Sequence, residues 1–140
     1  MRVQIMRAYH SNGQLRCEIP TVNGRNHGLK RDWYPNGVLA SEIPFVDGLE
    51  HGTAKVWASG GRLLGEYRME RGTGVVTIWR ADGTISSEGT MLKGEPTGRQ
   101  RCWDESGELV TEGYWLNGRR VSRKKYLEAC KADPSLPKDS

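Results

Sequence analysis

The stretch that decides the fold is Gly13-Gln14-Leu15-Arg16-Cys17-Glu18, because its pattern Gly-x-Leu-x-x-Glu recurs along the chain. The other copies span residues 37–42, 61–66, 83–88 and 107–112, with Ile85 in place of the leucine in the fourth. Successive leading glycines stand 24, 24, 22 and 24 residues apart. A period this short is typical of one supersecondary unit copied along a repeat protein.

Each unit has the pattern of a β-hairpin. In the second unit, Leu39, Ser41, Ile43 and Phe45 alternate with other residues, which predicts a strand with one packed face and the glutamate on the other. A second segment of strand length runs from Gly52 to the aromatic that ends it. Such an aromatic precedes every leading glycine by four residues: Tyr9, Trp33, Trp57, Trp79 and Trp103. Asn-Gly and Asp-Gly pairs between the segments favour tight hairpin turns.

These signals predict an all-β fold, an elongated and twisted antiparallel meander of about five β-hairpin repeats. We expect the array to cover residues 1–121, with units starting near residues 9, 33, 57, 79 and 103. The third unit is two residues shorter around Gly72 to Gly74. A tighter turn and a local change of curvature are therefore expected there.

The chain changes character after the last repeat. Ser122 is a suitable N-cap for a short, basic capping helix over residues 122–134, which Pro134 stops. Tyr126, Leu127 and Cys130 fall on one helical face that could cover the last hairpin. Residues 135–140 are interpreted as a tail.

Composition and charge restrict the class of protein. The net charge is +4, and residues 118–140 account for all of it, with seven Lys and Arg against three acidic residues. No apolar run approaches the roughly 20 residues needed to span a membrane. The first residues lack the apolar stretch of a signal peptide. Three cysteines at unrelated repeat positions argue against a disulfide framework, so a cytoplasmic location is expected.

The recurring motifs resemble the bacterial MORN repeat variant. The resemblance rests on the aromatic, the Asn-Gly turn, the Gly-x-Leu-x-x-Glu strand and the Asn-Gly-x-x-His-Gly run of residues 23–28, which residues 47–52 nearly repeat. It covers residues 9 to about 118. The resemblance implies a curved ribbon of hairpins with no catalytic centre. Many bacterial members look like antitoxin or immunity-type proteins, and eukaryotic relatives are associated with membranes and scaffolding.

Aromatic side chains are the first candidates for binding a partner. The tryptophans could pack on the leucines as core, but a single sheet cannot cover all of its own aromatic surface. Part of this surface would then form a binding face. The aromatic candidates for partner binding are Tyr34, Trp57, Trp79, Trp103, Tyr114 and Trp115.

The repeated glutamates are expected to be structural. Each has a copy one repeat away, whereas catalysis needs one asymmetric site. Arg31, Lys55 and Arg101 on the returning strands could alternate with them as cross-strand pairs. His27 and His51 precede turn glycines and lack a third ligand at a matching offset, so a turn role is favoured over a metal site. No catalytic, metal or cofactor motif is found, and we expect no enzyme activity and no cofactor.

A basic cluster is the last candidate. It comprises Arg119, Arg120, Arg123, Lys124 and Lys125. It could be the solvated start of the helix, or it could attract acidic lipid or an acidic protein. No nucleic-acid motif accompanies it, so nucleic acid is not expected as a partner.

The sequence therefore predicts a non-enzymatic protein–protein interaction module, specifically an antitoxin- or immunity-like neutraliser of a partner protein. One alternative is a peripheral membrane or scaffold adaptor that uses the basic cluster. Another is an accessory subunit of a larger complex.

Overall fold

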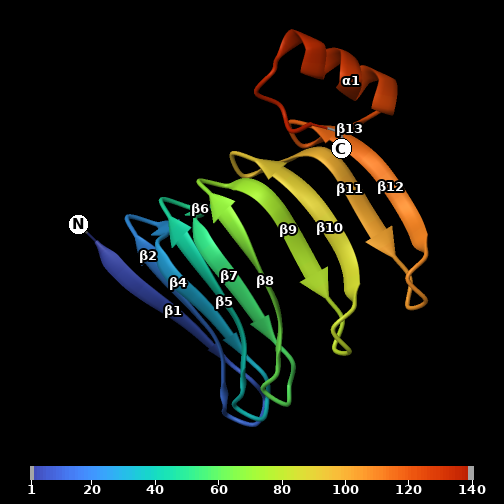
Figure 1. The fold of residues 1–140 in the computed structure, drawn as a ribbon. Helices are drawn as coiled ribbons and strands as arrows, with labels where there is room; N and C mark the ends of the chain where they lie inside the picture. The colour runs from blue at the N-terminus through green and yellow to red at the C-terminus, as the bar shows by residue number, and fades with distance from the viewer. Residues whose placement is uncertain (1, 139–140) are drawn as a thin grey trace.

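The computed structural model describes residues 2–138 and consists of one open antiparallel sheet and one helix (Figure 1). The strands of the recurring motif are β2 (Leu15–Val22), β5 (Leu39–Val46), β8 (Leu63–Glu70), β10 (Ile85–Leu92) and β12 (Leu109–Leu116). The strands that carry the aromatic are β1 (Val3–Tyr9), β4 (Gly28–Trp33), β7 (Gly52–Trp57), β9 (Thr73–Trp79) and β11 (Glu95–Trp103). Two short strands, β3 (Arg25–Asn26) and β6 (Leu49–Glu50), pair with β2 and β5 beside the main strand order, and β13 (Arg119–Val121) is the last strand of the sheet. The predicted all-β meander is confirmed.

A β-bulge recurs at the same place in every hairpin. The register shifts next to the aromatic, so that Trp33 pairs with Leu39, Trp57 with Leu63 and Trp103 with Leu109. Tyr9 and Leu15, and Trp79 and Ile85, pair in the same way. A bulge adds one residue to one strand. The bulge therefore interrupts the strict alternation of side chains between the two faces that was expected from the leucine onward. It also places the leucine opposite the aromatic of its own hairpin.

The two faces of the sheet differ in chemistry, because alternate residues of a strand point to opposite sides. We call one the ion-pair face: across the strands, Arg7, Glu18, Arg31, Glu42, Lys55 and Glu66 follow one another as direct partners. Farther along, Thr77, Glu88, Arg101 and Glu112 continue the row. The opposite side over β9 to β11 is the groove face, where Ile78, Ser87 and Cys102 are cross-strand partners.

The sheet opens between β8 and β9. These two strands pair only at Met69–Gly74 and Glu70–Thr73, next to their turn. In Figure 1 they lie together at that turn and diverge toward their other ends. We call this region the fork. It lies in the shortened third unit, where the sequence predicted a tighter turn and a change in curvature.

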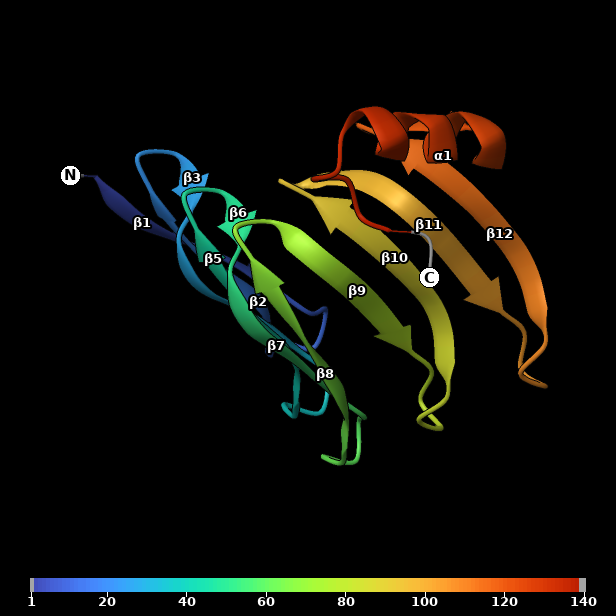
Figure 2. The same ribbon diagram turned by 45° about the horizontal axis from the view of Figure 1, so that its top comes forward.

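The C-terminal helix caps the last hairpin on the ion-pair face. Helix α1 spans Arg123–Ala132, and the Ser122 side chain accepts a hydrogen bond from the Lys125 backbone N–H, as the N-cap prediction requires. The fully buried Tyr126 ring packs on Tyr114 with the ring centres 5.8 Å apart. Figure 2 shows α1 lying across one end of β12.

The described residues after α1 pack against the rest of the fold. Leu136 is buried, and the Tyr126 hydroxyl donates a hydrogen bond to the Pro137 carbonyl. Pro137 and Lys138 line a recess with Val75, Thr90 and Arg99 of the ion-pair face. The last two residues of the predicted tail, 139 and 140, lie outside the described residues.

Candidate functional site

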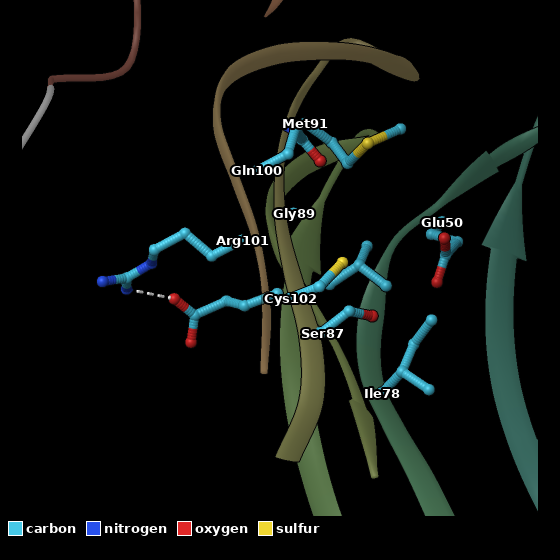
Figure 3. A pocket seen from close by; sticks show the side chains of 10 residues that line it. Glu50, Ile78, Ser87, Gly89, Met91, Gln100, Arg101 and Cys102 are labelled. Carbon is cyan, nitrogen blue, oxygen red and sulfur yellow. Dashed lines mark hydrogen bonds and ion pairs between the residues drawn. The ribbon is translucent and has the colours of Figure 1, made fainter. Parts of the chain in front are cut away.

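The groove face is hollowed over β9, β10 and β11 (Figure 3). The hollow has a volume of about 370 Å³, and we call it the groove. Its floor consists of side chains and backbone from the three strands, namely Val76, Ile78, Ser87, Gly89, Met91, Gln100 and Cys102. Glu50 of β6, which precedes these strands by a full unit, faces them from the other side. Curvature of the sheet thus brings two parts of the chain to one site.

The side-chain amide of Gln100 in the floor is already paired with the backbone. Gly89 leaves room for the side chain of Gln100, since a Cβ at Gly89 would lie 2.2 Å from the Gln100 amide oxygen. The Gln100 amide nitrogen donates to the Thr90 carbonyl at 2.7 Å. Glu88 and Arg101 also border the groove, but as cross-strand partners in the charged row they point to the ion-pair face, where they join at 2.7 Å. The groove itself is therefore mainly apolar.

Glu50 is held in place by Tyr67. The Tyr67 hydroxyl donates to Glu50 Oε1 at 2.8 Å. Burial, and then the hydrogen bond and the negative charge of Glu50, raise the pKa of Tyr67 well above its ordinary value. The phenol therefore keeps its proton at neutral pH and remains a donor to the Glu50 carboxylate.

Trp79 closes the fork beside the groove. Its indole lies on Gly65 of β8, where a Cβ would come within 2.3 Å of the ring. It also stacks on Tyr67 with ring centres 6.4 Å apart. Trp79 thus bridges β8 and β9 where their backbone ladder is open, which is a structural role for one of the predicted binding residues.

The other predicted aromatics fall at separate places. Tyr34 donates from its hydroxyl to the Trp57 carbonyl at 2.7 Å, which ties two neighbouring units together. Trp103 lies beside Arg101, whose guanidinium carbon is 5.1 Å from the ring centre. It borders a recess that also includes Ile85 and Glu88. Partner binding by Tyr34, Trp57 and Trp103 stays a prediction.

The aromatics of β12 are divided between the two faces. Tyr114 is 6% exposed beneath α1, so it belongs to the core and we leave it out of the proposed binding surface. Trp115 lies on the groove-face side, with the Arg120 guanidinium carbon 5.4 Å from its ring centre. The Trp115–Arg120 pair extends the groove face toward the C-terminal end of the sheet.

The predicted basic cluster is formed at the C-terminal end of the ribbon. Arg119 and Arg120 lie on β13, and the other three cations occupy the first turn of α1. All five are exposed, and Arg123 also donates to the Tyr114 hydroxyl at 3.2 Å. The cluster therefore lies beside the last hairpin, away from β9.

The glutamate ladder has the structural role that the sequence predicted. Arg7–Glu18 and Arg31–Glu42 make ion pairs of 3.0 Å, and Arg101–Glu88 makes one of 2.7 Å. Glu18, Glu42 and Glu88 have a neighbour of the same row on each side. Glu66, beside the fork, and Glu112, near the end of the sheet, each have such a neighbour on one side. Such a periodic row supplies no unique acid–base pair.

The histidines stabilise turns. His27 Nδ1 accepts a hydrogen bond from the Asp47 backbone N–H at 3.2 Å, and His51 Nδ1 accepts one from Arg71 at 3.0 Å. Asp47 and Arg71 both have positive φ, near 50°, so the imidazoles fix strained turn residues of the next unit. Within residues 2–138 no group of three or more His, Cys, Asp or Glu could hold a metal ion.

Sequence reasoning missed the groove. Ile78, Met91, Gln100 and Glu50 come from three different units, and no offset in the repeat relates them. The one signal in the sequence that could have indicated the groove is the shortened third unit. The fork lies in this unit, and the curvature of the sheet at the fork turns Glu50 toward β9.

Comparison with known proteins supports the repeat assignment over the first two units. The family described as MORN repeat variant matches residues 5–23 and 26–47. These matches support a MORN-repeat protein. MORN repeats are generally protein- or membrane-binding modules rather than enzymes. No curated protein and no solved structure matched the chain.

The register and the bulge of the two matched hairpins recur in the later units, so the same hairpin structure continues beyond residue 47. None of the helical residues described forms a segment that is long and apolar enough to cross a membrane.

Proposed function

We propose that this chain is a non-enzymatic protein–protein interaction module whose partner docks on the groove face. Its specific role would be that of an antitoxin- or immunity-like neutraliser, which covers the working surface of its partner and blocks it sterically. The MORN-repeat matches support a binding role.

The observation that carries the proposal is the unequal cover of the two faces. Over β9 to β12, helix α1 and the segment after it lie on the ion-pair face. No described residue covers the groove face in this way, and its Ile78 side chain is 55% exposed. An apolar surface left open on an otherwise capped sheet is the feature that marks protein-binding sites.

The test begins with capture of the partner. The tagged chain is purified from the cell that naturally makes it, the bound protein is identified by mass spectrometry, and the complex is rebuilt from the two purified chains. Calorimetry then compares Ile78→Asp with Val75→Asp. Both residues are exposed apolar positions of β9, at 55% and 40%, but they lie on opposite faces.

We expect Ile78→Asp to weaken the rebuilt complex at least tenfold, because a buried charge at the centre of an interface is costly. Val75→Asp should leave the affinity within about twofold. An equal loss in the two variants would place the interface elsewhere. Neutralisation is tested separately: the activity of the partner should fall when an equimolar amount of this chain is added.

The basic cluster favours a second candidate function, a peripheral adaptor for an acidic membrane surface. Four of its cations lie within residues 120–125, and each exposed cation near anionic lipid contributes about 1 kcal/mol of binding free energy. Sedimentation with vesicles of phosphatidylserine and phosphatidylcholine tests it. Binding that persists after charge reversal of all five cations, or that is unchanged in 1 M salt, would contradict this candidate.

A further inference from the structure

We infer that the groove takes an extended segment of the partner that inserts a lysine or arginine against Glu50 and large apolar side chains onto Ile78 and Met91. This inference rests on the proposed function and specifies the chemistry of the partner. It follows from the charge of the groove, from its open shape and from the way in which Glu50 is held.

The charge of the groove is negative and comes from one residue. Of the charged residues that line it, Glu88 and Arg101 neutralise each other on the ion-pair face. Glu50 has no ion-pair partner within residues 2–138, and the one hydrogen bond of its side chain there comes from the neutral Tyr67 hydroxyl. A half-buried carboxylate beside an apolar floor is the environment in which a cationic side chain gains most from a charge-assisted hydrogen bond.

The position of the carboxylate is fixed before a partner arrives. Tyr67 engages Glu50 Oε1, and the Tyr67 ring is itself stacked on Trp79. The backbone of Glu50 also accepts a hydrogen bond from the Gly72 N–H at 2.8 Å. Because both the side chain and the backbone of Glu50 are held, less side-chain entropy is lost when a cation binds.

The floor suits an extended segment. Its lining comes from the face of three neighbouring strands and is open to solvent, so side chains can enter from a chain that lies over the sheet. In an extended chain every second residue points the same way. The predicted recognition pattern is therefore a lysine or arginine two residues away from a leucine, isoleucine, methionine or phenylalanine. The lysine or arginine pairs with Glu50, and the apolar side chain covers Ile78.

The experiment uses a phage-displayed library of random twelve-residue peptides panned against the full chain. Panning is repeated with Ile78→Asp, and an enriched peptide is then synthesised for affinity measurements. We expect enrichment of the basic–x–apolar pattern on the wild-type chain and its loss on Ile78→Asp. Glu50→Lys should weaken the synthetic peptide at least tenfold, and a peptide with Glu in place of its cation should bind Glu50→Lys better than it binds the wild type.

Tyr67→Phe provides the matched control. It removes the hydrogen bond to Glu50 but keeps the carboxylate, whereas Glu50→Gln removes the charge but keeps an oxygen that can accept from the Tyr67 hydroxyl. Peptide affinity should therefore fall more in Glu50→Gln than in Tyr67→Phe, while thermal unfolding followed by circular dichroism confirms that both variants are folded. A loss in Tyr67→Phe as large as the loss in Glu50→Gln would show that the hydrogen bond from Tyr67 matters as much as the charge of Glu50, and would overturn the inference.

Two further results would also overturn it. One is the absence of any enriched sequence. The other is an enriched peptide that binds Glu50→Lys and Ile78→Asp with the same affinity as it binds the wild type. A different result would refute the proposed function: no natural partner forms a complex with the purified chain that is weakened by Ile78→Asp. If Ile78→Asp weakens the natural complex but Glu50→Lys does not, the proposed function stands, and the inference that a lysine or arginine of the partner pairs with Glu50 is wrong.

Discussion

The junction between the second and third hairpins and the junction between the third and fourth should be equivalent, yet one is closed and the other is open. Between β5 and β7 the backbone ladder crosses the middle of the strands at Ser41–Val56 and Glu42–Lys55. Between β8 and β9 the corresponding middle residues are not paired, and only the two pairs beside the turn remain. The same repeat thus yields two different joints.

Three features are missing together at the open joint. Lys55 stands opposite Glu42, but the β9 residue in the charged row is the neutral Thr77. Tyr34 reaches the carbonyl of Trp57, whereas Ala58 occupies the same place one unit later and has no side chain that could reach Trp79. The turn at Arg71 and Gly72 is also two residues shorter. The comparison indicates that side chains, not backbone propensity alone, keep neighbouring hairpins in register.

Removing the indole that bridges the open joint should have the largest effect. Trp79→Ala takes away the ring that lies on Gly65 and Tyr67, and we expect the free energy of unfolding to fall by about 3 kcal/mol. Urea denaturation followed by circular dichroism measures it. Trp103→Ala is the control, because that ring borders an open recess and should cost less. Equal losses would mean that Trp79 does not support the fork.

A methyl group at the same contact should have the next largest effect. Gly65→Ala places a Cβ about 2.3 Å from the Trp79 ring, so the ring must move at a cost of about 1–3 kcal/mol. Gly60→Ala is the matched control, because nothing lies within 4 Å of a Cβ there. Thermal unfolding should separate the two variants. A stable Gly65→Ala protein with native Trp fluorescence would contradict the packing described.

Restoring the missing cation should partly close the joint. Thr77→Lys puts a lysine in the row between Glu66 and Glu88, and a cross-strand ion pair contributes about 0.2–1 kcal/mol. Hydrogen exchange should show slower exchange of the amides in residues 63–68. Repeating the change in a Glu66→Gln background provides the control. A gain that survives this background would have a cause other than the Glu66 charge.

The smallest expected difference compares two glutamates of the ladder. Glu42 has Arg31 at 3.0 Å on one side and Lys55 as its cross-strand partner on the other, whereas Glu66 has only Lys55 across its ladder. Glu42→Gln should therefore cost about 0.5 kcal/mol and Glu66→Gln less, because these half-exposed pairs are weak. The difference should shrink in 1 M salt, where charges are screened beyond about 3 Å. A difference insensitive to salt would argue against ion pairing.

Much of the fold followed from the sequence because each unit specifies itself locally. The Asn-Gly and Asp-Gly turns, the leucine and the terminal aromatic predicted the strands, and Ser122 predicted the start of α1 within one residue. The charged row was also predicted, since Arg31, Lys55 and Arg101 occur at fixed distances from the glutamates. The bulge beside each aromatic was missed, because a register shift adds no distinctive residue.

The sequence by itself determined the repeated hairpin, the alternating charges and the capping helix, all of which depend on neighbours within one unit or the next. Only the tertiary structure decided which surface is open. Helix α1 could have covered either face of β12, and it is the packing of Tyr126 on Tyr114 that places it on the ion-pair face. The groove exists because the sheet curves past the fork and turns Glu50 toward β9. Such curvature accumulates over many strands, so no single repeat encodes it.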